Sequence, residues 1–104
     1  MVFSGSTDGR PIDVVGTSTP GTTIHVPGAG NTDEVWLYAT NSTATEELLT
    51  IVWDAPARRV EVLVPPDQTE MIIEGMRIDN SRVLSAFGAN GSTFKVMGHV
   101  NRLI

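Results

Sequence analysis

The sequence predicts an all-β protein, a single-domain antiparallel β-sandwich or jelly-roll-like barrel of roughly seven to eight short strands. Short runs rich in Val, Ile, Thr and aromatic residues recur along the chain at a spacing of about ten residues. Small clusters of Gly, Pro, Asn and Asp separate these runs and have the composition of turns. A chain of 104 residues has room for one core, which we expect in residues 22–104.

The N-terminal residues 1–21 are interrupted repeatedly by Gly and Pro. They predict an extended arm with one short strand at residues 12–15. Two interpretations are open: the arm is poorly ordered, as chain termini often are, or it lies on a neighbouring subunit. In the second case, we expect its anchors to be Phe3, Ile12 and Val14.

The first clear strand is predicted at residues 22–26, and the Pro-Gly-Ala-Gly-Asn cluster at 27–31 ends it. A longer strand follows at residues 33–41. Because side chains alternate along a strand, one face carries Val35, Leu37 and Ala39, and the other carries Trp36, Tyr38 and Thr40. Both faces are largely apolar, which is typical of a strand in the middle of a sandwich or with one face covered by another chain.

The segment from 43 to 53 is ambiguous. Residues 43–46 have the spacing of a helix capping box. Residues 48–53 form a short run that is rich in β-branched side chains and is followed by Asp-Ala-Pro, so we predict a strand there. The next strand, at residues 58–64, alternates cleanly, with Val60, Val62 and Val64 inward and Arg59, Glu61 and Leu63 outward.

A Pro-Pro-Asp-Gln turn at 65–68 leads into the last part of the chain. Gly75 is expected to break or bulge the strand that follows this turn. The loop at 88–92 contains Asn-Gly, a strong signal for a hairpin. The remaining strands are predicted at residues 69–74, 76–78, 82–87 and 93–101.

Composition excludes several classes of protein. The absence of Cys excludes a disulfide framework and a thiolate metal site. The net charge is −5, and the 7 basic residues form no stripe, so nucleic-acid binding is disfavoured. No apolar stretch approaches about 18 residues, which predicts no membrane partner. The N-terminus lacks the pattern of a signal peptide, and we expect synthesis in the cytoplasm.

No motif for catalysis stands out. His25 and His99 are not in a metal-ligand spacing, and we expect them to form hydrogen bonds or face solvent. The acidic pairs at 33–34 and 46–47 are expected to be solvated strand ends. No Ser lies in Gly-x-Ser-x-Gly. The sequence therefore predicts no catalytic residue, no metal site and no cofactor, and a protein that is not an enzyme.

The largest side chains allow two interpretations. Trp36, Tyr38 and Trp53 could stack on sugar rings if they lie on an exposed sheet face. Aromatic residues also contribute most buried area in cores and at subunit interfaces. We favour core or interface, and keep a carbohydrate-binding β-sandwich as an alternative.

A family resemblance is carried by three segments, EVWLYATN at 34–41, LTIVW at 49–53 and GHVNRLI at 98–104. Over roughly residues 19–104, the chain is similar to small proteins encoded among the head-assembly genes of tailed bacteriophages. These look like capsid decoration (cement) proteins or other small virion components, sandwiches that trimerise and sit on the shell.

The resemblance implies a structural virion protein of the capsid surface, made in the host cytoplasm. Its implied partners are the major capsid protein and further copies of itself, as a homotrimer. The residues expected at interfaces are Trp36 and Tyr38, with the arm residues Phe3, Arg10 and Ile12 toward the shell. A neck or tail connector or completion protein is the alternative within the virion.

Overall fold

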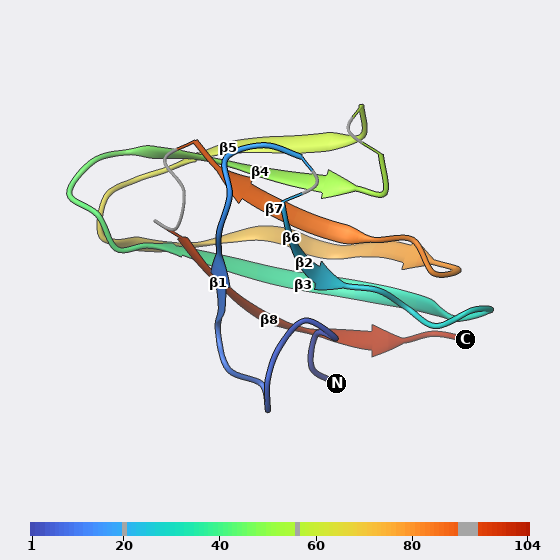
Figure 1. Ribbon diagram of the computed structural model, residues 1–104. Coiled ribbons are helices and arrows are strands. Elements are labelled where there is room, and N and C mark those ends of the chain that lie inside the picture. Colours follow the sequence, from blue (N-terminus) through green and yellow to red (C-terminus); the bar gives the residue numbers. More distant parts are fainter. Residues whose placement is uncertain (20, 56, 90–93) are drawn as a thin grey trace.

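The computed structural model describes residues 1–19, 21–55, 57–89 and 94–104. In these residues the chain forms two four-stranded antiparallel sheets that lie face to face (Figure 1). The strands are β1 (Ile12–Val14), β2 (Thr22–His25), β3 (Thr32–Asn41), β4 (Glu47–Trp53), β5 (Arg59–Val64), β6 (Gln68–Asp79), β7 (Leu84–Gly88) and β8 (Phe94–Arg102). The predicted all-β sandwich is confirmed.

The strand order is that of a jelly roll. One sheet has the order β1-β8-β3-β6 and the other the order β2-β7-β4-β5. The first strand pairs with the last, the second with the seventh, the third with the sixth and the fourth with the fifth, all antiparallel. The chain is therefore one long hairpin that is rolled up into a sandwich, as in double-sheet jelly rolls.

Strand β3 lies in the middle of its sheet, between β8 and β6. Its burial alternates strictly, and the apolar side chains that point inward are Val35, Leu37 and Ala39. They meet inward side chains of the opposite sheet, among them Leu49 and Ile51 of β4, in one hydrophobic core. The period-2 pattern of the sequence is thus the pattern of burial in the molecule.

The ambiguous segment before Asp54 is a strand, as predicted. Strand β4 pairs with β7 on one side and β5 on the other. The β-branched residues of β4 suit this central position, where both faces of the strand are packed. In β5 the valines point inward and Arg59, Glu61 and Leu63 are exposed, also as predicted.

The two short strands expected around Gly75 are one strand of 12 residues, β6. Val35 pairs with Met76 and Trp36 pairs with Glu74, so Gly75 is an extra residue without a partner. Its φ of 75° is a conformation that glycine adopts at no steric cost. A bulge of this kind bends a strand but preserves the hydrogen-bonded ladder on both sides.

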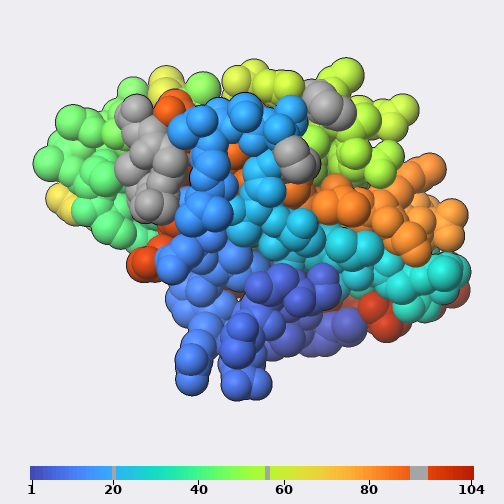
Figure 2. Space-filling model, in the orientation of Figure 1, coloured from blue at the N-terminus to red at the C-terminus, as the bar shows by residue number. Residues whose placement is uncertain are grey.

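The N-terminal arm belongs to the sandwich, which corrects the expectation of a separate segment. Strand β1 pairs with β8, and the side chains of Ile12, Val14 and Phe3 lie in the core of their own chain. The Met1 backbone also exchanges two hydrogen bonds with Val100. Figure 2 shows these N-terminal residues, in blue, against the body of the molecule and projecting beyond it.

The hairpin predicted at Asn90-Gly91 lies outside the described residues.

Candidate interaction face

The sheet β1-β8-β3-β6 has an outer face, away from the core, that carries large side chains. Directly paired residues share a face of a sheet, so Trp36 lies between His99 of β8 and Glu74 of β6, and Tyr38 lies between Met97 and Met71. We define the outer face by the residues Asp13, Glu34, Trp36, Tyr38, Thr40, Thr69, Met71, Glu74, Arg77, Lys95, Met97, His99 and Asn101.

Trp36 is held in a fixed orientation at the centre of the outer face. Its six-membered ring lies close to Gly75, where an added Cβ would be 3.3 Å from the indole Cζ2. The indole Nε1 donates a hydrogen bond of 3.0 Å to Oε1 of Glu34. The His99 ring is nearly parallel to the indole, at 11° and 6.1 Å between centroids. The glycine bulge therefore makes room for a half-buried tryptophan.

Glu34 presents a fixed negative charge beside this indole. Its Oε1 also accepts a hydrogen bond of 3.3 Å from Nδ2 of Asn101. The hydrogen bond from Trp36, followed by that from Asn101 and the nearby charges of Arg77 and His99, lowers the pKa of the Glu34 carboxyl. The carboxylate is thus ionised at neutral pH and oriented by two donors.

This arrangement suits two kinds of recognition. Half-buried aromatic and methionine side chains inside a charged rim are typical of the centre of a protein–protein interface. An indole with hydrogen-bonding groups at its edge also suits a sugar ring, which offers an apolar face and hydroxyl groups. The side chains of the outer face are therefore suited to binding either a protein or a sugar.

A second cluster of polar groups is buried at the end of the sandwich where the chain termini meet. Asp33 of β3 is 0% exposed, and its Oδ2 lies 2.6 Å from Nε2 of His25. Arg102 of β8 donates two hydrogen bonds to the same carboxylate, at 2.8 and 3.1 Å. The hydrogen bonds and charge of Arg102, and then those of His25, lower the pKa of the Asp33 carboxyl although its burial acts in the opposite direction.

The hydrogen bonds of His25 define its role in this cluster. The backbone N–H of Ser4 donates to Nδ1 of His25 at 3.0 Å, so Nδ1 is an acceptor and Nε2 carries the proton toward Asp33. The Ser4 hydroxyl oxygen accepts a hydrogen bond of 2.8 Å from the N–H of Val26. Both ring nitrogens are thereby engaged, and the cluster ties the N-terminal segment to β2, β3 and β8.

This cluster corrects the expectation that the acidic pairs are solvated. Asp33 is fully buried, and Glu47, at 8% exposure, is also buried. His25 forms hydrogen bonds and His99 is exposed on the outer face, so each histidine is in one of the two expected settings.

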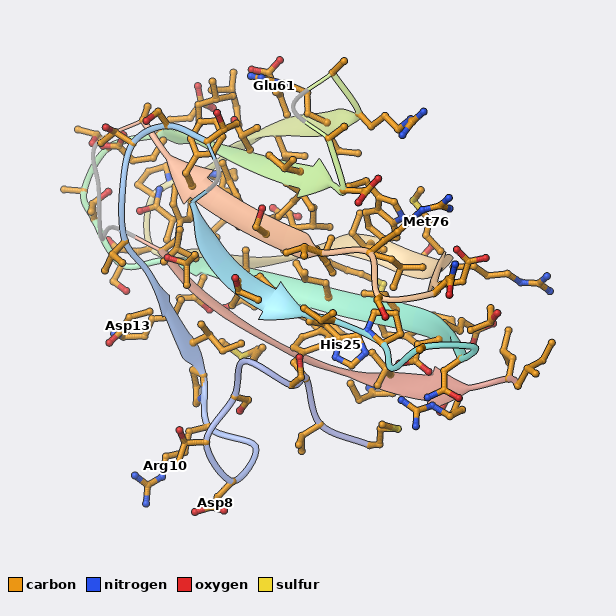
Figure 3. The ribbon with its side chains drawn as sticks, turned by 45° about the vertical axis from the view of Figure 1, so that its right-hand side comes forward. Asp8, Arg10, Asp13, His25, Glu61 and Met76 are labelled. Carbon is orange, nitrogen blue, oxygen red and sulfur yellow. The ribbon has the colours of Figure 1, made fainter. Side chains whose placement is uncertain are left out.

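The residues predicted at interfaces fall into two groups. Trp36 and Tyr38 lie together on the outer face, and Arg10 lies near Asp8 on the loop that projects from the body (Figure 3). Phe3 and Ile12 are 2% and 8% exposed within their own chain, so a partner could touch them only after they had left the core. This burial corrects the expectation that both side chains face a shell.

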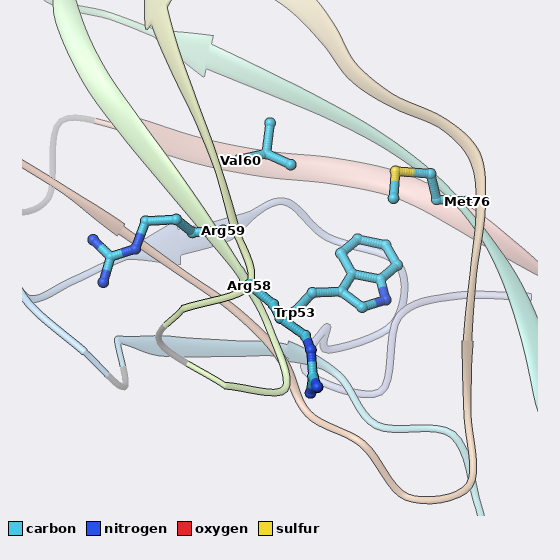
Figure 4. Close-up of a pocket in the computed structure, with 5 residues that line it drawn as sticks. All are labelled: Trp53, Arg58, Arg59, Val60 and Met76. Carbon is cyan, nitrogen blue, oxygen red and sulfur yellow. The ribbon is translucent and has the colours of Figure 1, made fainter.

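Trp53 lies apart from the other two large aromatic residues. It ends β4 in the opposite sheet, and its Nε1 donates a hydrogen bond of 3.1 Å to the carbonyl of Arg77. It lines a cavity of about 300 Å³, which we call the edge cavity, together with Arg58, Arg59, Val60 and Met76 (Figure 4). The hypothesis that Trp36, Tyr38 and Trp53 form a single sugar-stacking surface is therefore wrong.

Within the part of the chain that the structure describes, no three His, Cys, Asp or Glu side chains are grouped so that they could hold a metal ion. The same residues contain no helix long and apolar enough to cross a membrane. Comparison with protein-family models, with curated proteins and with solved structures gives no match. The resemblance to phage head proteins thus stays a prediction from the sequence.

Proposed function

We propose that the protein is a structural virion component, a capsid decoration protein that binds the assembled shell of the major capsid protein and stabilises it. The observation that supports this proposal is the outer face, where Trp36 and Tyr38 are held on a rigid sheet beside Met71 and Met97. Aromatic residues and methionines are enriched at the centres of protein interfaces, and a few such anchors contribute most of the binding energy.

The proposed activity requires only adhesion. A protein that binds the assembled shell, but not the free subunit, shifts the equilibrium toward the shell by mass action. A shell offers many equivalent sites, so any self-association of the decoration protein multiplies a modest affinity. The net charge of −5 favours a basic surface on the shell. The exposed Arg10 belongs to the same proposal, and so does the homotrimer that the resemblance implies, which we place on the assembled shell rather than in the free chain.

Co-sedimentation with shells that lack a decoration protein tests the proposal. We expect the wild-type chain to bind, and Trp36→Ala and Tyr38→Ala each to weaken binding by about tenfold or more, since truncated interface anchors cost about 2 kcal/mol. Val83→Ala, at an exposed apolar position just before β7 of the opposite sheet, is the matched control and should bind normally. Absence of wild-type binding, or unchanged binding of Trp36→Ala, would contradict the proposal.

The copy number in the same sediment separates the two locations in a virion. Many copies per particle agree with a decoration protein, whereas about six or twelve, the size of a ring at one vertex, would indicate a neck or tail connector.

Carbohydrate binding is the second candidate function. It is favoured by the polar groups at the edge of the Trp36 indole, where Glu34 accepts hydrogen bonds from both Trp36 and Asn101. Jelly-roll domains serve both in viral capsids and in lectins, so the fold alone does not decide between the candidates.

Tryptophan fluorescence tests this second candidate directly. The chain has two tryptophans, so Trp53→Phe leaves Trp36 as the sole tryptophan reporter. If the outer face binds sugars, a glycan panel should contain members that shift the emission of Trp36, and Glu34→Gln should weaken that response about tenfold, as expected for a lost charged hydrogen bond. Unchanged emission across the panel would remove this candidate.

A further inference from the structure

We infer that the edge of strand β5 binds β5 of a second copy of this chain, antiparallel, around a two-fold axis at Val60. Three features of the described residues converge on this arrangement: the regularity of the β5 edge, the edge cavity and the order of charges along β5. The inference does not depend on the proposed function, because it concerns the purified chain alone.

The first feature is that β5 is the least protected of the four edge strands. The edges β1 and β2 have only 3 and 4 residues, and β2 has a register shift against β7. The long edge β6 has two register shifts against β3. Short edges and bulges are devices that prevent strand addition. Strand β5 has 6 residues in unbroken register with β4.

The backbone of β5 is oriented for a further strand. The N–H of Trp53 donates to the carbonyl of Arg58 at 2.7 Å, in register with the β4–β5 ladder. In an antiparallel ladder, residues alternate between facing the partner strand and facing away from it. Val60 and Val62 therefore turn their peptide groups toward β4, and Arg59, Glu61 and Leu63 turn theirs toward the open edge.

The second feature is the edge cavity, which opens on the same side of the sandwich. Val60 reaches it from β5, Trp53 from the end of β4 and Met76 from the facing edge strand β6 (Figure 4). Met76 pairs with the inward residue Val35, yet it remains 46% exposed because no strand follows β6. A two-fold axis at Val60 would bring the edge cavities of two copies face to face and cover their apolar walls.

The third feature is the charge pattern, which selects the register. A two-fold axis at Val60 places Arg59 of each copy opposite Glu61 of the other. The Arg59 guanidinium, which lies 6.0 Å from the Phe87 ring of its own chain, would turn to the Glu61 carboxylate and give two opposite-charge pairs. An axis at Glu61 would place two carboxylates opposite each other, and an axis at Val62 would pair Glu61 with Leu63. Glu61 points away from the body at this edge (Figure 3), where a second copy can reach it. Such a self-complementary contact is isologous and closes as a dimer.

Light scattering and cysteine cross-linking test the arrangement. We expect the wild-type chain to have twice the mass of its 11.2 kDa subunit at about 100 μM. The chain has no Cys, so Val60→Cys introduces a single thiol, and we expect it to form a covalent dimer under mild oxidation. Val62→Cys is the matched control, because Val62 would face Arg58 of the other copy and should not cross-link.

Charge reversal gives a second, independent measurement. Arg59→Glu and Glu61→Arg should each weaken the dimer about tenfold or more, and the double variant should restore it because both pairs re-form with reversed sign. Lys95→Glu, on the other sheet, should leave the dimer unchanged. Circular dichroism verifies that each variant is folded. A monomer at this concentration, a trimer without Val60→Cys cross-links, or preferential cross-linking of Val62→Cys would overturn the inference.

Discussion

Replacing Asp33 by alanine is expected to destabilise the fold by about 3–5 kcal/mol, the usual cost of removing one partner from a buried ion pair. The substitution leaves the buried Nε2 of His25 without its acceptor and Arg102 without its bidentate partner. We expect the lower end of this range, because the Arg102 side chain is 38% exposed and water can reach it. For a domain of this size, the melting temperature should fall by roughly 10–20 °C.

Thermal unfolding followed by circular dichroism measures this effect, with Asp13→Ala as the matched control. Asp13 also pairs with a basic residue, Lys95 of β8, but both side chains are more than half exposed. Exposed pairs contribute about 0–1 kcal/mol, so this control should melt within a few degrees of the wild type. Equal melting temperatures for the two variants would show that the buried cluster does not stabilise the fold.

The same carboxylate should make stability depend on pH in acid. The hydrogen bonds from Arg102 and His25 lower the pKa of Asp33 in the folded state below its ordinary value of 3.8. A lowered pKa means that the ionised group favours the folded state above that value, and that this contribution is lost as the pH falls through the folded-state pKa. Asp33→Asn should therefore reduce the loss of stability below about pH 4, and an unchanged pH profile would contradict this role.

The strands could be predicted from sequence because their signal is local. The alternation in β3 and β5 lies within a few neighbouring residues, and it predicts both the strand and the face of each side chain. The N-terminal arm has no such pattern. Phe3, Ile12 and Val14 are isolated apolar residues, and only the pairing of β1 with β8 reveals that they complete the core.

The candidate site was predictable only in part, because some of its contacts join residues that are far apart in the sequence. Alternation predicts that Trp36 and Tyr38 share a face, but the approach of Asn101 to Glu34 depends on residues 67 positions apart. Asp33 looks like a solvated strand end because acidic residues are most often exposed. Its burial depends on Arg102, 69 positions away, and only the register of β3 against β8 brings the two together.

The register of β3 against β8 also leaves no room for a side chain at Gly98. We therefore expect Gly98→Ala to destabilise the fold by about 3 kcal/mol or more. Gly98 pairs with Leu37, next to the pair of Trp36 and His99. An added Cβ would lie 2.0 Å from the carbonyl oxygen of Trp36 and 3.0 Å from its carbonyl carbon. Both atoms belong to the backbone of the central strand, so relief of the clash requires β8 to move away from β3. The φ of 147° adds strain for any other residue.

Gly30→Ala is the matched control for this substitution, because it changes a glycine of positive φ that has no atom within 4 Å of the added Cβ. Backbone strain alone should cost this control about 1–2 kcal/mol. Urea unfolding separates strain from clash, since the midpoint of Gly98→Ala should fall well below that of Gly30→Ala. Displacement of β8 should also move His99 from Trp36 and change the tryptophan emission of the folded state. Equal midpoints for the two variants would mean that β3 and β8 are not packed as closely as this register requires.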